Sequence, residues 1–488
     1  MASHWNQDGG GHVSTTIEKL TVPGLTDDET VTLNLLVQQL ADKQRRNQMR
    51  SNLYDGRNAV RQVGGVIPPQ YADLALVLGW VAKGVDGLDN RCTLEKMVWT
   101  GGDLDALGMQ QLEDSNYLLS ELAMARTDSL IHGVSYLVTT RGVEADGEPP
   151  VLVHARDALH ASGEWNTRRR ALDALLSVTS WDDDRITGFV LYLDNMTINA
   201  SKTAGTWTVD RSEHTFGVPA DPLVYRPRGS RRMGRSRISR PAISIQNSAL
   251  RALVRAEAHM DIYAIPKMIL LGGSDAMFKN PDGSTKASWE VVMGRVFGIP
   301  DDDNPKNPTP RADVKTVNAE SPAPHHAQLN VQAKLIAREF DLPDQDFALT
   351  DMANPTSEGS YVQGRDSLVA EAENATGAWS IPIRRRVAAA LAMQNGLTAV
   401  PESWKSMQPK WRSPLYLSKS QAAAAGSQQL SAVPWLAETE VGLELLGLDE
   451  QQIQRALVEK RRDAGRAVIA ALANRAPAQP PQANAVGA

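Results

Sequence analysis

Two long amphipathic patterns that flank a short non-helical segment constrain this chain more than any other feature of its sequence. Residues 321–341 repeat apolar side chains at intervals of three and four, which predicts a helix that Pro343 ends. Residues 361–379 repeat them in the same way, and we expect Pro382 to end this second helix. The segment between them is small and polar, and it consists of Asn354, Pro355, Thr356, Ser357, Glu358, Gly359 and Ser360. Helix, irregular loop and helix in this order present a loop, although an ordinary helical hairpin has the same pattern.

Each of these two helices has an expected polar side. In the first pattern Leu329, Leu335, Ile336 and Phe340 form the apolar face, and Lys334, Arg338 and Glu339 lie opposite. In the second, Tyr361, Leu368, Ala372, Ala375 and Trp379 form the apolar face, and Arg365, Asp366, Glu371 and Glu373 are polar. We therefore expect these charged side chains to lie on the polar side of each helix.

A run of arginines is the second unusual feature. Seven of them fall within fifteen residues that contain no acid: Arg226, Arg228, Arg231, Arg232, Arg235, Arg237 and Arg240. Guanidinium groups this close repel one another unless an anionic group lies nearby. The run indicates contact with phosphates or with an acidic face of a neighbouring subunit, and a solvated basic loop is the alternative.

The first half of the chain combines helices and strands. Thr26 and Glu29 have capping-box spacing, which predicts a helix to about Arg50 that the Tyr54-Asp55-Gly56 turn stops. A long helical pattern follows over residues 103–130. Strand patterns then cover residues 135–140, 151–155, 186–194 and 206–210, separated by turn residues. Because crossover helices between these strands are missing, we predict an α+β fold with a meandering antiparallel sheet.

Prolines divide the second half. Pro219, Pro222 and Pro227 mark the end of the sheet region, and Pro241 opens a helix that Pro266 ends. Strand patterns at residues 268–271, 289–292 and 314–317 predict a small strand-rich module between two long helices. Further helices are expected from residue 387 to 393, 419 to 430 and 449 to 474, and residues 476–488 have the composition of a disordered tail.

Composition restricts the function. Cys92 is the single cysteine, so an intrachain disulfide is impossible, and we expect it to be a small buried apolar residue. No run reaches the 18 or so apolar residues of a membrane span, and the N-terminus lacks a signal-peptide pattern, so we expect an intracellular product. A formal charge of −6 argues against tight binding of DNA along the whole surface.

No catalytic motif is found. The sequence lacks a phosphate-binding G-x-x-x-x-G-K-S/T loop, a zinc-peptidase histidine pair and a G-x-S-x-G elbow. His154, Asp157 and His160 have no evident reason to converge, and we expect them to be structural or surface residues. The runs Asp182–Asp184 and Asp301–Asp303 are the obvious carboxylate clusters, and the second resembles a metal site only superficially. We therefore expect no catalytic, cofactor or metal site.

The order of these elements is similar to that of the portal proteins of tailed double-stranded DNA phages, over roughly Thr26 to Asn474. Both contain, in this order, a basic segment, a long helix, a strand-rich insertion, and a helix, loop and helix. The family's Gly-x-Ser element matches Gly234-Arg235-Ser236-Arg237-Ile238 here. Arg237 replaces the usual acid after the serine, so no particular contact carries over.

This resemblance implies a multi-domain portal fold that assembles into a ring. Its divisions would be a flexible N-terminus (1–25), wing (26–240), stem helix (241–266), clip (267–320), second stem helix (321–342), tunnel loop and tunnel helix (343–395), return to the wing (396–430), helical crown (431–475) and disordered tail (476–488). Residues 354–360 would be the tunnel loop, and the helix from Tyr361 to Trp379 the tunnel helix.

The resemblance also implies partners and a location. The chain would form a dodecamer at the capsid vertex, made in the host cytoplasm, with double-stranded DNA passing through its channel. It would bind the terminase large subunit, a head-completion or adaptor protein, the major capsid protein and a scaffold, and no membrane would be involved. A capsid-associated metal-dependent nuclease or other packaging enzyme is the rival hypothesis. Another ring-forming virion protein, which would lack the insertion between stem helices, is a third.

Overall fold

The computed structural model describes residues 19–57, 76–182, 185–263, 267–271, 284, 313–317, 321–347, 366–415 and 419–473. The chain divides into two compact units, Met1–Pro414 and Leu415–Ala488. The predicted loop, residues 354–360, and the carboxylate run Asp301–Asp303 lie outside the described residues, as do Asp183, Asp184 and the tail from residue 474.

Helix α1 (Asp27–Tyr54) begins as predicted. Thr26 accepts a hydrogen bond from the Glu29 amide, and the Glu29 carboxylate accepts one from the Thr26 amide, so the capping box is complete. The helix buries Leu33, Leu36 and Leu40 on one face. These side chains pack on a sheet and form one of the hydrophobic cores of the first unit.

That sheet is a five-stranded antiparallel meander whose strands are neighbours in sequence order. The strands are β4 (Ala161–Asn166), β5 (Ala171–Asp182), β6 (Arg185–Leu193), β7 (Met196–Thr203) and β8 (Thr206–Glu213). Side chains alternate between its two faces, so Leu176 packs on α1 whereas Leu175 faces the opposite layer. The predicted α+β class with a meandering sheet is confirmed, although β4, β5 and β7 were not predicted.

A second, three-stranded sheet of order β3-β2-β9 forms the next layer. Its strands are β2 (Val134–Arg141), β3 (Val151–Arg156) and β9 (Ala220–Val224). Val134, Tyr136 and Val138 of the central strand face the five-stranded sheet, whereas the alternate residues face helices α4 and α9, as the Ser135 and Thr139 hydroxyl contacts with them show. Pro222 lies inside β9 and does not end the sheet region as predicted, because an edge strand tolerates a missing amide donor.

The helical pattern over residues 103–130 is interrupted. It forms a 3-10 turn at Asp105–Leu107, helix α3 (Met109–Asn116) and helix α4 (Leu118–His132). Tyr117 separates α3 from α4 with a left-handed φ of 49°. The prediction of one long helix was therefore wrong. The apolar periodicity continues across Tyr117, but the helical conformation of the backbone is interrupted there.

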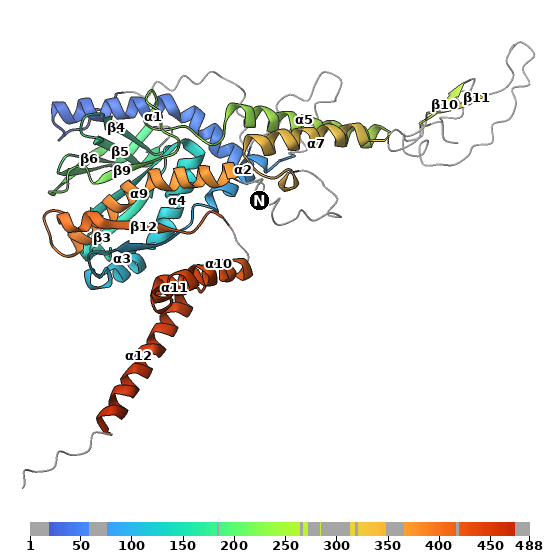
Figure 1. Cartoon of the computed structure of the whole chain (residues 1–488). Helices are drawn as coiled ribbons and strands as arrows, with labels where there is room; N and C mark the ends of the chain where they lie inside the picture. The colour runs from blue at the N-terminus through green and yellow to red at the C-terminus, as the bar shows by residue number, and fades with distance from the viewer. Residues whose placement is uncertain are drawn as a thin grey trace, which may run out of the picture. The chain divides into compact units, whose positions relative to one another are not determined.

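Helices α5 (Arg240–Tyr263) and α7 (Ala323–Glu339) run side by side in opposite directions (Figure 1). Three contacts connect the two helices along their length: Ser239 with Glu339, Ser248 with Gln332, and His259 with His325. Between them in sequence, β10 (Lys267–Leu271) and β11 (Asp313–Val317) form an antiparallel pair, and residues 289–292 of the predicted module lie outside the described residues. On α7, Ile336 is buried as predicted, but Leu335 is half exposed.

Helix α9 (Asp366–Gln394) contains Pro382 and does not end there. The prediction that Pro382 closes this helix was therefore wrong, and the helix expected over residues 387–393 is its continuation. Trp379, Ile383 and Val387 on both sides of the proline are fully buried. Packing against the three-stranded sheet and its neighbours holds the helix through a residue that removes one backbone donor.

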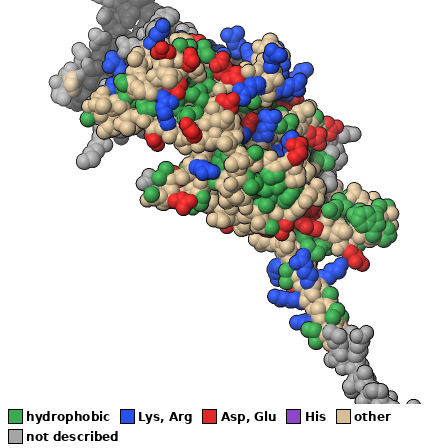
Figure 2. All heavy atoms as spheres, turned by 90° about the vertical axis from the view of Figure 1, so that its left-hand side faces the viewer, with side chains coloured by type: hydrophobic (Ala, Val, Ile, Leu, Met, Phe, Trp, Pro, Cys, Tyr) green, Lys and Arg blue, Asp and Glu red, His purple; other side chains and the backbone are tan. Residues whose placement is uncertain are grey.

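Strand β1 (Leu94–Trp99) pairs with β12 (Met407–Trp411), which joins distant parts of the first unit. Helix α2 (Trp80–Asp89) precedes β1 and packs on α4, α5 and α9. Over the face of the molecule in Figure 2, basic and acidic side chains are interspersed.

The second unit is helical in its described part. Its helices are α10 (Lys419–Ala432), α11 (Glu440–Leu445) and α12 (Glu450–Ala473). Lys and Arg side chains project on both sides of α12 (Figure 2). In the described part of the chain, no helix combines the length and apolar character needed to cross a bilayer.

Candidate functional site

Arg237 is buried where four elements meet. Its Nε donates to the Gly84 carbonyl of α2 over 2.8 Å, and its Nη2 donates to the Phe340 carbonyl at the end of α7 over 2.7 Å. Its Nη1 lies 2.5 Å from Oε2 of Glu371 in α9. The guanidinium also lies over the Phe340 ring, 5.5 Å from its centroid. One side chain therefore joins α2, α7 and α9 to the segment after β9.

Glu371 is the acid that the arginine run requires. Its carboxylate pairs with Arg237 and, over 2.9 Å, with Arg226, and it accepts a hydrogen bond from the Tyr225 hydroxyl. Burial lowers the pKa of Arg237, but the Glu371 carboxylate and the Tyr225 hydroxyl together outweigh burial, and the net shift is upward. The pKa of Tyr225 is raised, mainly by burial. The helical pattern places Glu371 on the polar side of α9, and the structure buries it there, because periodicity alone does not distinguish a solvated polar face from a buried ion pair.

The Gly-x-Ser element fixes the backbone that carries Arg237. Gly234 has a φ of 65°, and a Cβ there would lie 2.3 Å from the Tyr225 carbonyl oxygen and 2.5 Å from that of Gly133. Ser236 is buried, and its hydroxyl contacts the Ile131 carbonyl and accepts from the Ile238 amide. The Arg237 amide donates to the Leu130 carbonyl over 2.8 Å. Glycine and serine are thus required here by close backbone approach and by a buried turn.

The described residues on either side of the predicted loop converge on this same junction. Before the loop, Phe347 stacks on Phe340 with ring centroids 6.5 Å apart and meets Trp80 edge-on at 6.3 Å. After the loop, Leu368 in the first turn of α9 is fully buried. Because Arg237 binds both the Phe340 carbonyl and Glu371, it holds the chain before the loop and the chain after it in one place.

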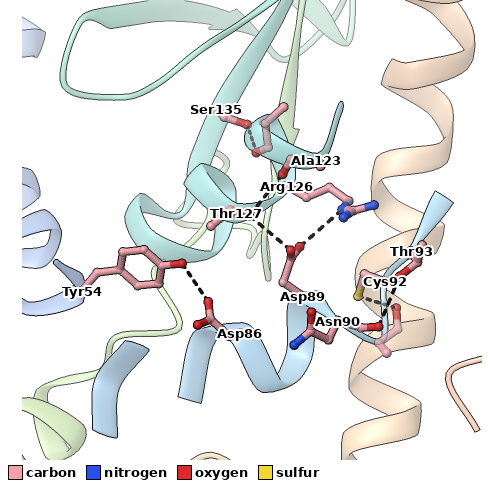
Figure 3. Close-up of polar contacts among 12 residues, drawn as sticks. Tyr54, Asp86, Asp89, Asn90, Cys92, Thr93, Ala123, Arg126, Thr127 and Ser135 are labelled. Atoms are coloured by element: carbon pink, nitrogen blue, oxygen red, sulfur yellow. Dashed lines mark hydrogen bonds and ion pairs between the residues drawn. The ribbon is translucent and has the colours of Figure 1, made fainter. Parts of the chain in front are cut away.

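Helix α2 supports the junction through a polar network that Figure 3 shows. Asp89, at the end of α2, accepts hydrogen bonds from two residues of α4, from Arg126 Nε over 3.3 Å and from the Thr127 hydroxyl over 3.2 Å. On the preceding turn, Asp86 accepts from the Tyr54 hydroxyl of α1 over 2.7 Å. Burial raises the pKa of Asp89, which Arg126 partly offsets. These contacts hold α2 in position against α1 and α4.

A glycine face of α2 lies directly on the end of α7. A Cβ at Gly84 would come within 2.4 to 2.6 Å of the Phe340 ring, and one at Gly87 within 2.9 Å of Leu342. No side chain larger than hydrogen fits between α2 and Phe340 at this distance. Apart from two glycines in a helical segment, no pattern in the sequence indicates this contact.

The other arginines of the run lie on the surface. Arg226, Arg228, Arg231, Arg232, Arg235 and Arg240 are exposed, in contrast to buried Arg237. Arg226, Arg228 and Arg235 line a hollow of about 400 Å³ whose other walls include Glu371, Asn374 and Ala378 of α9. The structure therefore divides the run into one internal arginine and six surface arginines.

Three further expectations concern possible reactive groups. Asp157 and His160 do meet, with Oδ1 2.8 Å from Nδ1, which corrects the expectation that they would not converge. The contact lies within a local turn, and within the described ranges no group of three or more His, Cys, Asp or Glu side chains could hold a metal ion. Cys92 is buried as predicted, and burial raises the pKa of its thiol to about 12.

Comparison with known proteins assigns the chain. The family model described as "Phage portal protein, SPP1 Gp6-like" matches residues 35–466. The chain belongs to this family. This portal protein is therefore a structural protein of the virion, and its Arg237 junction joins the described residues that come before and after residues 354–360 in sequence.

The portal protein is also similar to chains in solved particles of a gene transfer agent. A chain in the virion of the native particle is 15% identical, with a TM-score of 0.38, and the alignment covers 82% of this portal protein and 99% of that chain. A chain in the neck of the native particle, computed with C12 symmetry, is 16% identical with a TM-score of 0.38, covering 82% and 98%. No match was found among curated proteins.

Proposed function

We propose that this portal protein forms a closed ring at one capsid vertex and that double-stranded DNA enters and leaves through the ring. The observation that carries this proposal is the match of the portal family model to residues 35–466. The family resemblance implies twelve copies, and at a formal charge of −6 each they carry −72 in total. Such a charge favours a low-friction channel, since strong binding of phosphates requires a basic excess.

Residues 354–360 are the proposed tunnel loop that touches the moving DNA, and α9 is the proposed tunnel helix. Two features support this assignment. The segment is small and polar with one acid, Glu358, which can approach phosphates without binding them. The residues on both sides of it are attached to one buried ion pair, Arg237 with Glu371, so a moving loop would be attached to a fixed base.

The domain divisions follow from the same assignment. The α1 and two-sheet region forms the wing, the antiparallel α5 and α7 pair the stem, the segment containing β10 and β11 the clip, and the C-terminal helices the crown. The clip would bind the terminase large subunit during packaging and head-completion or adaptor proteins afterwards. Other contacts would be made to the major capsid protein and to a scaffold.

We also propose that the chain is not an enzyme and needs no cofactor. Metal-assisted hydrolysis requires carboxylates that converge on a metal ion, and no group of three or more His, Cys, Asp or Glu side chains among the described residues could hold one. Magnesium-dependent cleavage of DNA by the purified protein would contradict this proposal and favour the nuclease hypothesis.

The ring is tested by measuring the mass of the purified protein with native mass spectrometry and imaging the same sample by negative-stain microscopy. We expect a closed ring of about a dozen subunits with a central hole, as the family resemblance implies. Where rings need scaffold to form, the same imaging is applied to particles assembled with capsid and scaffold proteins. A chain that forms no ring under either condition contradicts the proposed function.

A further inference from the structure

The six surface arginines lie on a fixed backbone. The Arg228 amide donates to the Arg231 carbonyl over 3.0 Å and the reverse bond is 2.9 Å, which closes a tight turn. The Arg235 amide donates to the Tyr225 carbonyl over 3.0 Å, so the segment folds back on the end of β9. These backbone bonds fix the main chain from which the guanidinium groups extend, which lowers the backbone entropy lost on binding.

This surface is crowded with like charge. No acid within the described ranges forms an ion pair with Arg228, Arg231, Arg232 or Arg235, and Glu371 is already neutralised by Arg237 and Arg226. The crowding extends to α1, where the pKa of Arg50 is lowered to about 10 by burial and then by Arg46 and Arg231. An anionic partner would relieve this repulsion, and the hollow of about 400 Å³ provides a concave place for it.

The same unit carries an acidic surface of matching character, which we call the acidic segment, residues 103–117. It contains Asp103, Asp105, Glu113 and Asp114 and no Lys or Arg. Asp103, Asp105 and Asp114 are exposed, and none of the four forms an ion pair with a described residue. The pKa of Glu113 is raised by burial and then by Asp114 and Asp105, so this surface is also crowded with like charge.

The acidic segment ends in an exposed aromatic residue. Tyr117 is 78% exposed and has a strained φ of 49° between α3 and α4. A tyrosine held in this way is a common anchor in protein interfaces, because its ring buries a large area with little loss of conformational freedom. Charge and an apolar anchor thus lie within the same fifteen residues.

The arginine hollow and the acidic segment lie at opposite ends of α9. The hollow is formed along Glu371 to Ala378. At the other end, Gln394 donates to the Gly108 carbonyl over 3.1 Å and Asn395 donates to the Leu107 carbonyl over 3.0 Å, which attaches the acidic segment there. At 1.5 Å per residue, the two surfaces are separated by roughly 25 to 35 Å along the helix. They cannot neutralise each other within one chain.

The two surfaces also lie at opposite edges of the three-stranded sheet. The hollow follows β9, whose Val224 pairs with the first residue of β2, Val134. Asn116 of the acidic segment exchanges hydrogen bonds with the Val151 carbonyl and the Val153 amide of β3, and Val151 pairs with Arg141, the last residue of β2. Head-to-tail association requires complementary surfaces on opposite sides of the same subunit. Such association closes into a ring when the rotation between copies allows it.

We propose that the surface arginines around the hollow, chiefly Arg228 and Arg235, bind the acidic segment of the next copy in the ring, with Tyr117 as its apolar anchor. This inference rests on the proposed ring and names the surfaces that build it. Binding of DNA phosphates by these arginines is the competing assignment. The acidic segment is favoured because it supplies matching charge and an aromatic anchor on the same chain.

Charge reversal of each surface, followed by mixing, tests the proposal. One variant carries Arg228→Glu and Arg235→Glu, and the other carries Asp105→Lys and Asp114→Lys. We expect each alone to need at least a tenfold higher concentration than wild type to associate. When the two are mixed, every contact in an alternating order again joins opposite charges, so association should return to within about threefold of wild type. A reversal of two exposed basic residues elsewhere, Arg168→Glu with Lys202→Glu, is the matched control and should leave association unchanged.

The outcomes are distinguishable by native mass spectrometry, which detects mixed pairs as well as rings. Mixing that fails to restore association overturns the inference, as does normal association of either reversed variant alone. Normal rings that release packaged DNA when Arg228 and Arg235 are reversed would assign the arginines to DNA. A wild-type chain that forms no ring contradicts the proposed function itself and is seen in the same experiment.

Discussion

Arg237 and Glu371 form an ion pair in which both side chains are only 4% exposed. The arginine lies in the segment after the sheets and the glutamate in the second turn of α9, so the pair joins parts of the chain that helices α5 and α7 separate in sequence. The guanidinium has four polar partners: Glu371, the Tyr225 hydroxyl and the carbonyl oxygens of Gly84 and Phe340. A buried charge with this many partners is costly to expose and costly to leave unpaired.

Removing one partner of this pair should destabilise the protein strongly. We expect Glu371→Ala to lower the free energy of unfolding by about 3–5 kcal/mol, because it leaves the Arg237 charge buried without its acid. Replacing both residues by apolar ones, Arg237→Met with Glu371→Leu, should cost less than Glu371→Ala alone. Urea denaturation of the two variants and wild type measures both values.

Arg226 is the control for the buried pair, because it contacts the same carboxylate from the surface with its side chain 45% exposed. Arg226→Ala should change the free energy of unfolding by about 1 kcal/mol or less. An equal loss for Arg226→Ala and Glu371→Ala would show that burial does not decide the strength of this site.

Gly84→Ala should destabilise the contact between α2 and the end of α7. The new methyl would overlap the Phe340 ring, and overpacking of this kind costs about 1–3 kcal/mol, more than the roughly 1 kcal/mol that alanine gains in a helix. Gly377→Ala in α9 is the matched control, since nothing lies within 4 Å of its Cβ position, and it should stabilise the protein slightly. Thermal unfolding of the two variants gives the comparison, and a stabilised Gly84→Ala would mean that Phe340 moves aside freely.

Acid should weaken the protein through His132. Burial lowers the pKa of His132 to about 4, with Arg50 and His160 acting in the same direction and Asp157 against them. Because the folded pKa lies below the unfolded one, the contribution of His132 to stability is complete above about pH 6.5 and is lost as the pH falls toward 4. The loss is on the order of 3 kcal/mol at the lower limit.

The variant His132→Gln isolates this effect from that of other titrating groups. Burial raises the pKa of Asp128 to about 7, so the contribution of Asp128 to stability grows as the pH falls, opposite to that of His132. The difference in free energy of unfolding between wild type and His132→Gln should shrink from pH 7 to pH 4. A difference that stays constant over this range would exclude His132 as the source.

Glu358→Lys should slow the passage of DNA through the ring. Twelve lysines at the proposed tunnel loop would bind phosphates, whereas twelve carboxylates repel them. Glu358→Gln removes the charge without reversing it and should remain close to wild type. The rate of DNA packaging into particles assembled with each variant measures the effect, which should weaken as the salt concentration rises. Equal packaging rates for the lysine variant and wild type would place Glu358 away from the DNA.

Much of the fold could be predicted from local pattern. The capping box at Thr26 and Glu29, the meandering strands and the pair of long helices around a strand-rich insertion all follow from residues close in sequence. Errors occurred where tertiary packing overrides local preference. Pro382 lies inside a helix because buried neighbours on both sides hold it, and Tyr117 breaks a pattern that apolar spacing continues.

The site was harder to predict because it is made of long-range contacts. The arginine run showed that an acid was needed, and the acid proved to be Glu371, which helical periodicity had placed on a polar face. Nothing in the spacing of Gly84 indicates that it touches Phe340. A single sequence does not record which buried positions face one another, and the junction at Arg237 consists almost entirely of such pairs.

The pairing of β1 with β12 has a consequence for how the protein is made. Residues 94–99 find their partner strand only at residues 407–411, after the segments assigned to stem, clip and tunnel loop have been synthesised. A nascent chain on the ribosome therefore holds β1 as an open edge for most of its translation, and the first unit closes only when nearly all of it has emerged. A chain that stops before residue 407 therefore lacks the partner strand of β1, and its first unit stays open at that edge.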